Sequence, residues 1–564
     1  MVQRILGLSC FFHDSAVAAI DHGRIAFAIQ EERLSRVKHD AGLPVRSIAT
    51  ALDVMGWKPE EVDTVAFYEN PEWKLHRIRE QLDTTRPEHV ADSPRIMTSF
   101  LQHKYPVANL LRREFDFRHI VMGEHHRSHA AAAFFTSPFD RAVVVTIDGV
   151  GESETAAVFI GEGNTLRRVR SIRFPHSLGL FYSVFTQYLG FEVNEGEYKV
   201  MGLAPYGKPT QLSRLMPELL RLEDGGGFTL NLDYFDFEGR TRHYTDALIA
   251  HLGVGPRAPS DHVTEWHCDL AASVQAALEA GVMNLLSSVI REYDCDQVCL
   301  GGGVALNCTA NAKAIRELGV KLHVHPAAGD AGGALGAALF EAAASATELY
   351  RPAFTPYLGA SYDDRDISRA VESTGYRSRK SSCMALELAQ RLAAGQVIGV
   401  LHGRDEWGPR ALGARSILAD PRSPGMKEHL NAKIKFREEF RPFAPVVLEE
   451  HYSEYFETLG MLASPHMLYT HKALKPGEIA ASVHADGTSR VQTVNRDQHA
   501  RLYDIIGQFA RLTGVPVLIN TSFNLRGEPI VSSPADALRT FAASDIDCVA
   551  LGDYLVVKNG HEHA

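Results

Sequence analysis

The sequence predicts an α/β protein in which a duplicated first domain is followed by a second α/β domain. Two observations support this prediction. One order of strands and turns occurs twice in the first third of the chain, and glycine-rich turns join buried strands to helical segments. The length of 564 residues also exceeds the roughly 250–300 residues that one hydrophobic core usually serves. We therefore expect at least two domains.

The repeated unit is a strand, a loop, a second strand, a tight turn and a third strand. Its first copy is predicted at residues 4–9, 15–20 and 23–31, with Asp-His-Gly as the turn. Its second copy is predicted at 142–147, 155–160 and 165–172, with Gly-Glu-Gly-Asn as the turn. The copies share a pattern more than residues, which indicates an internal duplication.

The remaining elements continue the alternation of strands and helices. A buried strand at 297–300 leads into a glycine-rich stretch and a helix. Residues 350–362 contain two prolines and tight-turn residues that interrupt an alanine-rich helical run, so we place the boundary between domains 1–352 and 353–564 there. In the second domain we expect helices at 383–394 and 533–543 and strands at 397–401 and 515–518.

The composition excludes several classes of protein. A formal net charge of −11 argues against nonspecific nucleic-acid binding, and no apolar stretch approaches the ~18 residues that span a bilayer. The N-terminus lacks the length and flanks of a signal peptide, and seven cysteines without paired zinc-type spacing are typical of reduced thiols. We therefore expect a cytoplasmic protein that binds neither nucleic acid nor membranes.

One basic cluster differs from this acidic background. Residues 404–441 contain nine lysines and arginines against six acidic residues. A local excess of this size suits a small anion rather than a polyanion. A solvated basic face is the alternative interpretation.

Two histidines one helical turn apart indicate a metal site. In the predicted helix that begins with "HHRSH", His125 and His129 lie at i and i+4 on one face, although His126 with His129 at i and i+3 is also compatible. Asp148 follows a buried strand, and Asp330 starts a probable helix, where it is either an N-cap or a further ligand. Two imidazoles and two carboxylates suit Fe(II), Mn(II) or Zn(II) better than Mg(II). Histidines that merely solvate or cap a surface helix are the alternative.

Glycine-rich loops at the ends of two buried strands are candidates for a nucleotide site. Gly149 and Gly151 lie in the first loop, and Gly302, Gly303 and Asn307 lie in the second. Backbone amides in such loops can turn toward a phosphate, and the order strand, glycines, helix is typical of nucleotide sites. Ordinary turns are the alternative for each loop.

Several long motifs together resemble one known family. In the first domain these are "GLSCFFHDSAVA", "EERLSRVKHD", "EHHRSHAAAAFF", "TIDGVGE", "EYKVMGLAPYG", "GGVALN" and "GDAGGALGAAL". In the second they are "EWGPRALGARSILADPR", "KFREEFRPFAP", "HADGTSRVQTV" and "NTSFNLRGEPIVSSPADAL". They look like the bacterial O-carbamoyltransferases, a family that includes nodulation-factor and antibiotic-tailoring enzymes such as tobramycin carbamoyltransferase. The resemblance covers nearly the whole chain in the expected order.

The resemblance implies a fold and two sets of site residues. It implies a first domain of the duplicated actin-like ATPase (ASKHA) fold that binds iron, followed by a YrdC-like domain that makes carbamoyl adenylate from carbamoyl phosphate and ATP. The metal ligands carried over by motif are His125, His129, Asp148 and Asp330. The pocket residues carried over for the second domain are Arg410, Lys435, Arg441, Arg490, Ser522 and Asn524, with Lys435 and Arg441 expected to stabilise developing charge. Salt bridges that serve only the structure are the alternative for these arginines.

The predicted function is ATP-dependent transfer of a carbamoyl group to a hydroxyl of a small-molecule acceptor, a natural product or a sugar-like compound. The adenylate would be seated by the glycine loops, and a divalent metal would polarise its carbonyl. His13 and Asp14 are candidates for holding or deprotonating the acceptor hydroxyl, with a turn cap beside a packed histidine as the alternative. We expect Mg²⁺ with the ATP, and a homodimer is one option for the assembly.

Two other functions remain open from the sequence. They are tRNA threonylcarbamoylation, which the net charge of −11 disfavours, and a kinase-like nucleotide-binding protein. Contacts to the acceptor are expected in the segments 70–106 and 222–258, which join predicted elements and carry no nucleotide or metal motif.

Overall fold

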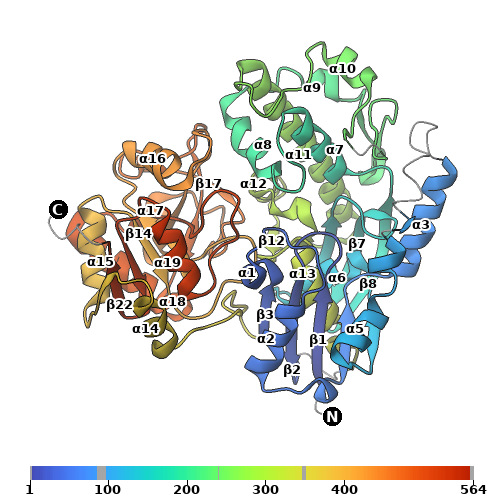
Figure 1. The fold of residues 1–564 in the computed structure, drawn as a ribbon. Coiled ribbons are helices and arrows are strands. Elements are labelled where there is room, and N and C mark those ends of the chain that lie inside the picture. The colour runs from blue at the N-terminus through green and yellow to red at the C-terminus, as the bar shows by residue number, and fades with distance from the viewer. Residues whose placement is uncertain (1–2, 85–96, 99, 239–240, 346–350, 559–564) are drawn as a thin grey trace. The chain divides into compact units, whose positions relative to one another are not determined.

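The computed structural model describes residues 3–84, 97–98, 100–238, 241–345 and 351–558 (Figure 1). The chain forms two compact units. The first comprises Met1–Ala28 and Ala41–Phe354, and the second comprises Ile29–Asp40 and Thr355–Ala564. The segment Ile29–Asp40, which the sequence analysis assigns to the first domain, therefore groups with the second unit.

The first unit contains two five-stranded sheets with the same topology. In the first sheet the order is β3-β2-β1-β4-β5, and in the second it is β8-β7-β6-β11-β12, so both read 3-2-1-4-5 in their own chain order. The first sheet consists of β1 (Arg4–Ser9), β2 (Ala16–Asp21), β3 (Arg24–Gln30), β4 (Thr64–Phe67) and β5 (Ile120–Met122). The second consists of β6 (Arg141–Ile147), β7 (Glu154–Glu162), β8 (Thr165–Arg173), β11 (Gln297–Gly301) and β12 (Lys321–Val324). The predicted duplication is confirmed, and with it the α/β class and the actin-like arrangement of the first domain.

Helices connect and cover these sheets. They are α2 (Val45–Met55), α3 (Pro71–Thr84), α5 (Val107–Phe115), α6 (His125–Phe135), α7 (Leu178–Tyr188), α8 (Glu197–Leu203), α9 (Leu212–Leu215), α10 (Asp246–Leu252), α11 (Glu265–Tyr293), α12 (Cys308–Leu318) and α13 (Asp330–Ser345). A small ribbon of β9 (Leu220–Leu222) and β10 (Phe228–Leu230) lies among them. Most of these helices pack against a sheet or another helix, as an amphipathic sequence requires.

Helices α6 and α13 form the centre of the first unit. α13 packs against β1, β2 and β4, α6 packs against β6 and β11, and the two helices pack against each other. The pair therefore lies between the two sheets, and almost every residue of α6 is buried. Because α6 begins at His125 and α13 begins at Asp330, this packing fixes the position of both polar side chains.

Close approach of backbones in this region depends on glycine. A Cβ at Gly336 would lie 1.8 Å from the carbonyl oxygen of Ser128, and one at Gly7 would lie 1.9 Å from that of Ala334. Neither distance is possible for a real side chain, so only glycine lets α13 approach α6 and β1 this closely.

The expectation that no segment is long and apolar enough to span a bilayer is wrong for one helix. Among the described residues, α11 alone is long and apolar enough to cross a membrane by length and composition, and 61% of its most apolar window is buried inside the protein. The helix packs against α7, α8, α9 and α12. Its apolar character is accounted for by its position in the core of this unit.

The second unit is built on an eight-stranded mixed sheet in the order β13-β22-β21-β14-β15-β20-β16-β19. Its strands are β13 (Arg377–Lys380), β14 (Ile398–Leu401), β15 (Arg415–Ala419), β16 (Ala444–Leu448), β19 (Gln492–Val494), β20 (Val517–Ser522), β21 (Cys548–Leu551) and β22 (Tyr554–Val557), and β17 (Thr470–Lys472) pairs with β18 (Thr488–Arg490) in a separate ribbon. The helices are α1 (Glu31–Ser35), α14 (Asp364–Glu372), α15 (Met384–Ala393), α16 (Gly425–His429), α17 (Tyr452–Tyr455), α18 (Arg496–Thr513) and α19 (Pro534–Ala542). Two apolar clusters fill this unit.

With one exception, the predicted elements agree with these bounds to within about two residues at each end. The strand predicted at 515–518 runs from Val517 to Ser522, so it ends four residues later than predicted. It starts at Val517 because Pro516 has no N–H to donate to a ladder. Parts of the segments 70–106 and 222–258 that were expected to contact the acceptor, namely residues 85–96, 99 and 239–240, lie outside the described residues.

Candidate functional site

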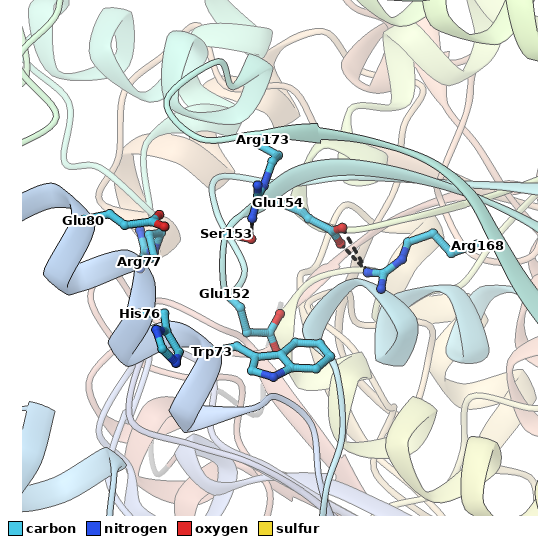
Figure 2. Close-up of a pocket in the computed structure, with 9 residues that line it drawn as sticks. All are labelled: Trp73, His76, Arg77, Glu80, Glu152, Ser153, Glu154, Arg168 and Arg173. Atoms are coloured by element: carbon cyan, nitrogen blue, oxygen red, sulfur yellow. Dashed lines mark hydrogen bonds and ion pairs between the residues drawn. The ribbon is translucent and has the colours of Figure 1, made fainter.

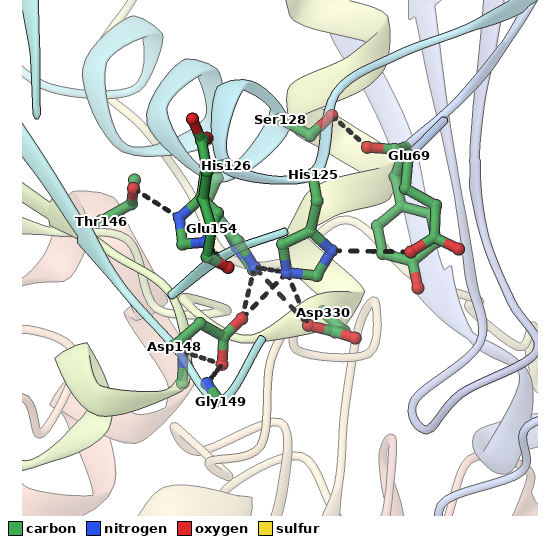
Figure 3. Close-up of polar contacts among 12 residues, drawn as sticks. Glu69, His125, His126, Ser128, Thr146, Asp148, Gly149, Glu154 and Asp330 are labelled. Atoms are coloured by element: carbon green, nitrogen blue, oxygen red, sulfur yellow. Dashed lines mark hydrogen bonds and ion pairs between the residues drawn. The ribbon is translucent and has the colours of Figure 1, made fainter. Parts of the chain in front are cut away.

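Four side chains from three separate parts of the chain meet near the starts of α6 and α13, and Figure 3 labels three of them, His125, Asp148 and Asp330. Each of His125, His129, Asp148 and Asp330 offers one donor atom, and these four atoms all lie within 4.8 Å of one another. Oδ2 of Asp148 lies 3.0 Å from Nε2 of His125 and 2.9 Å from Nε2 of His129. Oδ1 of Asp330 lies 3.7 and 3.5 Å from the same two nitrogens. The structure therefore brings together all four predicted ligands.

The chemistry of this donor set fits a divalent transition metal. The Nε2 atoms of His125 and His129 lie only 3.1 Å apart, and all of the His125, His129 and Asp330 side chains are buried. Oδ2 of Asp330 is buried without a hydrogen-bond partner. Nitrogen and oxygen donors that converge in this way match the ligand preferences of Fe(II), Mn(II) or Zn(II).

The ionisation of the cluster follows from its burial and charge. Burial alone would lower the pKa of His129, but hydrogen bonds to Asp148 and Asp330 outweigh it and raise that pKa to about 10. Burial alone would raise the pKa of Asp148, but the histidines hold it well below its usual range. Two carboxylates are thus ionised in a buried site, and a cation, either a proton on histidine or a metal ion, must balance them.

The structure also decides between the two histidine pairs. His126 is hydrogen bonded on both ring nitrogens, with Nδ1 2.8 Å from Oγ1 of Thr146 and Nε2 2.9 Å from the carbonyl oxygen of Glu154. Burial lowers its pKa to about 3. His126 therefore faces away from the cluster, and the pair at i and i+4 remains.

A buried charge cluster beside His125 was not predicted. Glu69 is fully buried directly after β4, with Oε1 2.5 Å from Nζ of Lys104 and Oε2 3.1 Å from Nζ of Lys74. Its Oε2 atom also lies 3.8 Å from Nδ1 of His125, on the ring side opposite Asp148 (Figure 3). Nδ1 of His125 is buried without a hydrogen-bond partner in the described residues, so Glu69 acts on this imidazole through its charge and not through a hydrogen bond. A carboxylate at the end of a sheet strand, the signal that identified Asp148, would have identified Glu69 if the strand "TVAF" had been recognised.

Glu152 supports the same helix from the other side. Its Oε1 atom accepts the backbone N–H of His125 at 2.9 Å and that of Asn70 at 2.7 Å. It therefore satisfies an otherwise unpaired N–H at the start of α6 and ties that helix to the segment before α3.

The predicted nucleotide-binding glycines lie around Asp148. The N–H groups of Gly149 and Gly303 donate to Oδ1 of Asp148 at 2.8 and 3.3 Å, which leaves Oδ2 for the histidines. Gly151 donates to the carbonyl of Glu154, and Gly302, at φ +86°, donates to that of Ala328. These amides are engaged within the protein, so their contact with a nucleotide stays a prediction.

Three further predicted residues have local partners. Asn307 caps α12 by accepting the N–H of Ala310, and its side chain also bonds Gln275. Nδ1 of His13 lies 3.3 Å from Oδ2 of Asp14. Burial alone would lower the pKa of His13, but the carboxylates of Asp14, Asp330 and Asp148 outweigh it and raise the pKa to about 9. His13 and Asp14 thus belong to the electrostatic surroundings of the four-residue cluster, whereas Asn307 serves at least as a helix cap.

In the second unit, Lys435 lies at the centre of the predicted anion pocket. Its buried Nζ atom contacts the carbonyl oxygen and Oγ of Ser522 at 2.7 and 3.3 Å and the carbonyl oxygen and Oδ1 of Asn524 at 2.8 and 2.7 Å. Burial holds the pKa of Lys435 well below its usual range, and the charges of Arg437 and Arg441 lower it further. The structure thus joins Lys435, Ser522 and Asn524 directly and Arg441 electrostatically.

Two other predicted arginines lie on loops and edges of this unit. Arg410 lies in the turn between β14 and β15, and Arg490 ends β18. Their part in the pocket stays a prediction. Lys38, from the segment Ile29–Asp40, also lowers the pKa of Lys435, and this contribution from the N-terminal part of the chain was not foreseen.

Both units of the chain match known families of proteins. Residues 4–339 match the family described as carbamoyltransferase N-terminus, and residues 389–558 match carbamoyltransferase C-terminus. The chain is 39% identical to the uncharacterized protein sll1178 of Synechocystis, over 99% of this chain and 97% of the relative. It is 38% identical to the nodulation protein NolNO of Sinorhizobium fredii, over 97% of this chain and 79% of the relative.

Among solved structures, component A of the (R)-2-hydroxyglutaryl-CoA dehydratase of Acidaminococcus fermentans is similar at 16% identity and a TM-score of 0.34, over 61% of this chain and 100% of that one. The two family matches together cover most of the sequence and both units of the structure. The chain belongs to the carbamoyltransferase family and is a carbamoyltransferase enzyme.

Proposed function

We propose that the protein is an ATP-dependent O-carbamoyltransferase that acts in two half-reactions. In the first, water hydrolyses carbamoyl phosphate to carbamate and inorganic phosphate, and the carbamate attacks the α-phosphorus of ATP and displaces pyrophosphate to form carbamoyl adenylate. In the second, a hydroxyl of a small-molecule acceptor attacks the carbamoyl carbon and displaces AMP. Mg²⁺ accompanies the ATP.

The first half-reaction is assigned to the second, YrdC-like unit. Among the described residues, no carboxylate pairs with the buried Lys435, whose Nζ contacts only neutral oxygen atoms. Burial and the neighbouring cations disfavour the ammonium form of Lys435, and the more distant charge of Glu528 favours it without an ion pair. An anion bound beside Nζ would stabilise the ammonium form. The phosphate of carbamoyl phosphate supplies such a charge, and Arg441 adds to the attraction. Arg410 and Arg490 complete the proposed pocket, with Ser522 and Asn524 toward the carbamoyl end.

The second half-reaction is assigned to the four-residue cluster of the first unit. His125, His129, Asp148 and Asp330 would hold the metal, for which we propose Fe(II) or another divalent transition metal. When bound, this ion supplies Lewis acidity to the carbamoyl carbonyl. Gly149, Gly151, Gly302, Gly303 and Asn307 are the proposed contacts to the adenylate.

His13 is the group that we propose to hold or deprotonate the acceptor hydroxyl. Two of the three carboxylates that raise its pKa, Asp148 and Asp330, are proposed metal ligands. A divalent cation that neutralises them would lower the pKa of His13 toward neutrality, so that the imidazole can accept a proton. Asp14, 3.3 Å from Nδ1, would hold the ring in place.

The observation that carries this proposal is that each unit holds one candidate site. In the first unit, four donor atoms suited to a metal ion lie within 4.8 Å of one another. In the second, the buried Nζ of Lys435 forms no ion pair among the described residues. The test is to incubate the full chain with carbamoyl phosphate, ATP and Mg²⁺ and to measure pyrophosphate. We expect release only when both substrates are present. Steady ATP turnover to ADP without carbamoyl phosphate would instead indicate a kinase-like enzyme, and pyrophosphate release without carbamoyl phosphate would contradict the proposed first half-reaction.

The remaining features of the proposal concern the cellular setting. All seven cysteines are free, in keeping with a reducing compartment such as the cytoplasm. The partners are carbamoyl phosphate, ATP and the acceptor, without nucleic acid or a membrane. A homodimer stays a prediction.

A further inference from the structure

A pocket of about 330 Å³ lies in the first unit (Figure 2). Helix α3 contributes Trp73, His76, Arg77 and Glu80, the loop before β7 and the first residue of that strand contribute Glu152, Ser153 and Glu154, and β8 contributes Arg168 and Arg173. The volume is at the lower end of the range of small-molecule sites, roughly 300–1,000 Å³. Nothing in the reaction described above uses this pocket.

The pocket is lined by three arginines and three glutamates, so its charged side chains balance in number. In the described part of the chain, neither Arg77 nor Arg173 forms an ion pair, whereas Arg168 pairs with Glu154 at 2.8 Å. Nε of Arg77 is buried and has no hydrogen-bond partner, and burial lowers the pKa of Arg77 to about 10. The charge of Glu152 favours the ionised form of Arg77, and an oxyanion that reaches Arg77 would supply the missing hydrogen-bond acceptor for Nε.

An aromatic ring forms another wall of the same pocket. The Trp73 side chain is 45% exposed, which is unusual for so large an apolar surface, and Figure 2 shows the indole beside Glu152. A flat indole with one free face is suited to pack against a ring of a ligand. The pocket thus offers a ring platform and fork-shaped donors side by side.

Glu152 connects the pocket to the proposed transfer centre. Its carboxylate lines the pocket, and its Oε1 atom holds the N–H of His125 at 2.9 Å. A molecule in the pocket is therefore separated from a proposed metal ligand by one side chain. The pocket is therefore suited to hold a part of the acceptor that does not itself react.

We propose that this pocket binds the acceptor of the carbamoyl group through a ring that packs on Trp73 and an oxyanion that contacts Arg77 and Arg173. This inference rests on the proposed function, because only that function makes the bound molecule an acceptor of the carbamoyl group. It names a class of substrate, a hydroxylated ring compound with a carboxylate, phosphate or sulfate group. An oxyanion can also come from free inorganic phosphate, so the test includes both sources.

The test measures binding to the full chain by calorimetry with three probes: glucuronate, glucose and inorganic phosphate. We expect glucuronate to bind at least tenfold more tightly than either of the others. Arg77→Gln should weaken glucuronate at least tenfold, and Trp73→Ala should weaken glucuronate but not phosphate. Arg79→Gln is the matched control, because Arg79 is exposed on the same helix and does not line the pocket. If Arg77→Gln does not fold, Arg173→Gln on β8 gives the same comparison.

Three results would overturn the inference. They are no binding of glucuronate, equal binding of glucose and glucuronate, and binding that Arg77→Gln leaves unchanged. Phosphate that binds as tightly as glucuronate, with no effect of Trp73→Ala, would make the pocket a simple oxyanion site and reject its role for an acceptor.

Pyrophosphate release separates this inference from the proposed function. The wild-type chain and the Arg79→Gln control should release pyrophosphate from carbamoyl phosphate and ATP at the same rate, because Arg79 does not line the pocket and Lys435 belongs to the other unit. If the wild type releases none, the proposed function fails, while the binding result with glucuronate still decides whether the pocket takes such a compound.

Discussion

The Nε2 atoms of His125 and His129 lie 3.1 Å apart, and Oδ2 of Asp148 lies 3.0 and 2.9 Å from them. This arrangement predicts that Fe(II), Mn(II) or Zn(II) stabilises the first unit, because an ion that binds only the folded form shifts unfolding by mass action. At a metal concentration 100 times the dissociation constant, the gain is about 2.7 kcal/mol. Thermal unfolding with added metal and with a chelator measures it.

Asp330→Asn should abolish most of this metal-dependent stabilisation. His126→Gln is the control, since His126 bonds Thr146 and Glu154 instead of facing the cluster, and it should keep the full increment. An equal loss in both variants would place the ion elsewhere.

Glu69→Gln should destabilise the protein by about 3–5 kcal/mol, because it leaves Lys74 and Lys104 buried without their shared counter-charge. Denaturant unfolding measures the loss, and Glu72→Gln, an exposed position on α3, should change little. Adding Lys104→Met to Glu69→Gln should recover part of the stability. If the double variant is no more stable than Glu69→Gln, the ion pairs are not the cause.

Gly336→Ala should cost about 3 kcal/mol, because its Cβ would lie 1.8 Å from the carbonyl oxygen of Ser128 and would force α13 away from α6. Gly507→Ala is the matched substitution, in α18 with nothing within 4 Å, and it should gain about 0.5–1 kcal/mol. Unfolding curves of both variants make the comparison. Similar effects of the two changes would argue against the close helix packing.

The second unit should lose stability between pH 6.5 and about 4. Nδ1 of the buried His499 accepts the N–H of Leu502 at 3.1 Å, and burial lowers its pKa to about 4. An unfolded histidine titrates near 6.5, so below that pH the unfolded chain binds more protons and stability falls, by up to ~1.4 kcal/mol per pH unit for this one group. Above pH 6.5 the group contributes no pH dependence.

His499→Gln should make this pH dependence shallower, as measured by denaturant unfolding at several pH values. His451→Gln, at an exposed position of the same unit, should leave the slope as it is. A slope that does not change in the His499 variant would mean that the proton uptake occurs at other groups.

Much of the fold could be predicted because its elements are local patterns. The repeated strands and the starts of α6 and α13 follow from alternation, turn residues and helix periodicity, which need no knowledge of distant contacts. The segment Ile29–Asp40 could not be placed, since its arginines bond to carbonyls hundreds of residues away, as Arg36 does to Ile530. Such pairings leave no periodic signal.

The candidate site shows the same limit. His125 and His129 were found from their spacing of one helical turn, and Asp148 and Asp330 because the first follows a buried strand and the second begins a helix. Glu69 was missed because the strand Thr64–Phe67 was not recognised, and Lys104 because no local pattern marks its ion pair with Glu69. The spacing of histidines could not choose between His125 and His126, and only the contacts of His126 with Thr146 and Glu154 did so.

The most direct test of a division of labour between the two units compares Lys435→Ala with His129→Ala in two assays. One assay follows pyrophosphate released from carbamoyl phosphate and ATP, and the other follows carbamoyl transfer from supplied carbamoyl adenylate to an acceptor. We predict that Lys435→Ala loses the first activity and keeps the second, and that His129→Ala does the reverse. Equal losses in both assays for either variant would contradict the account.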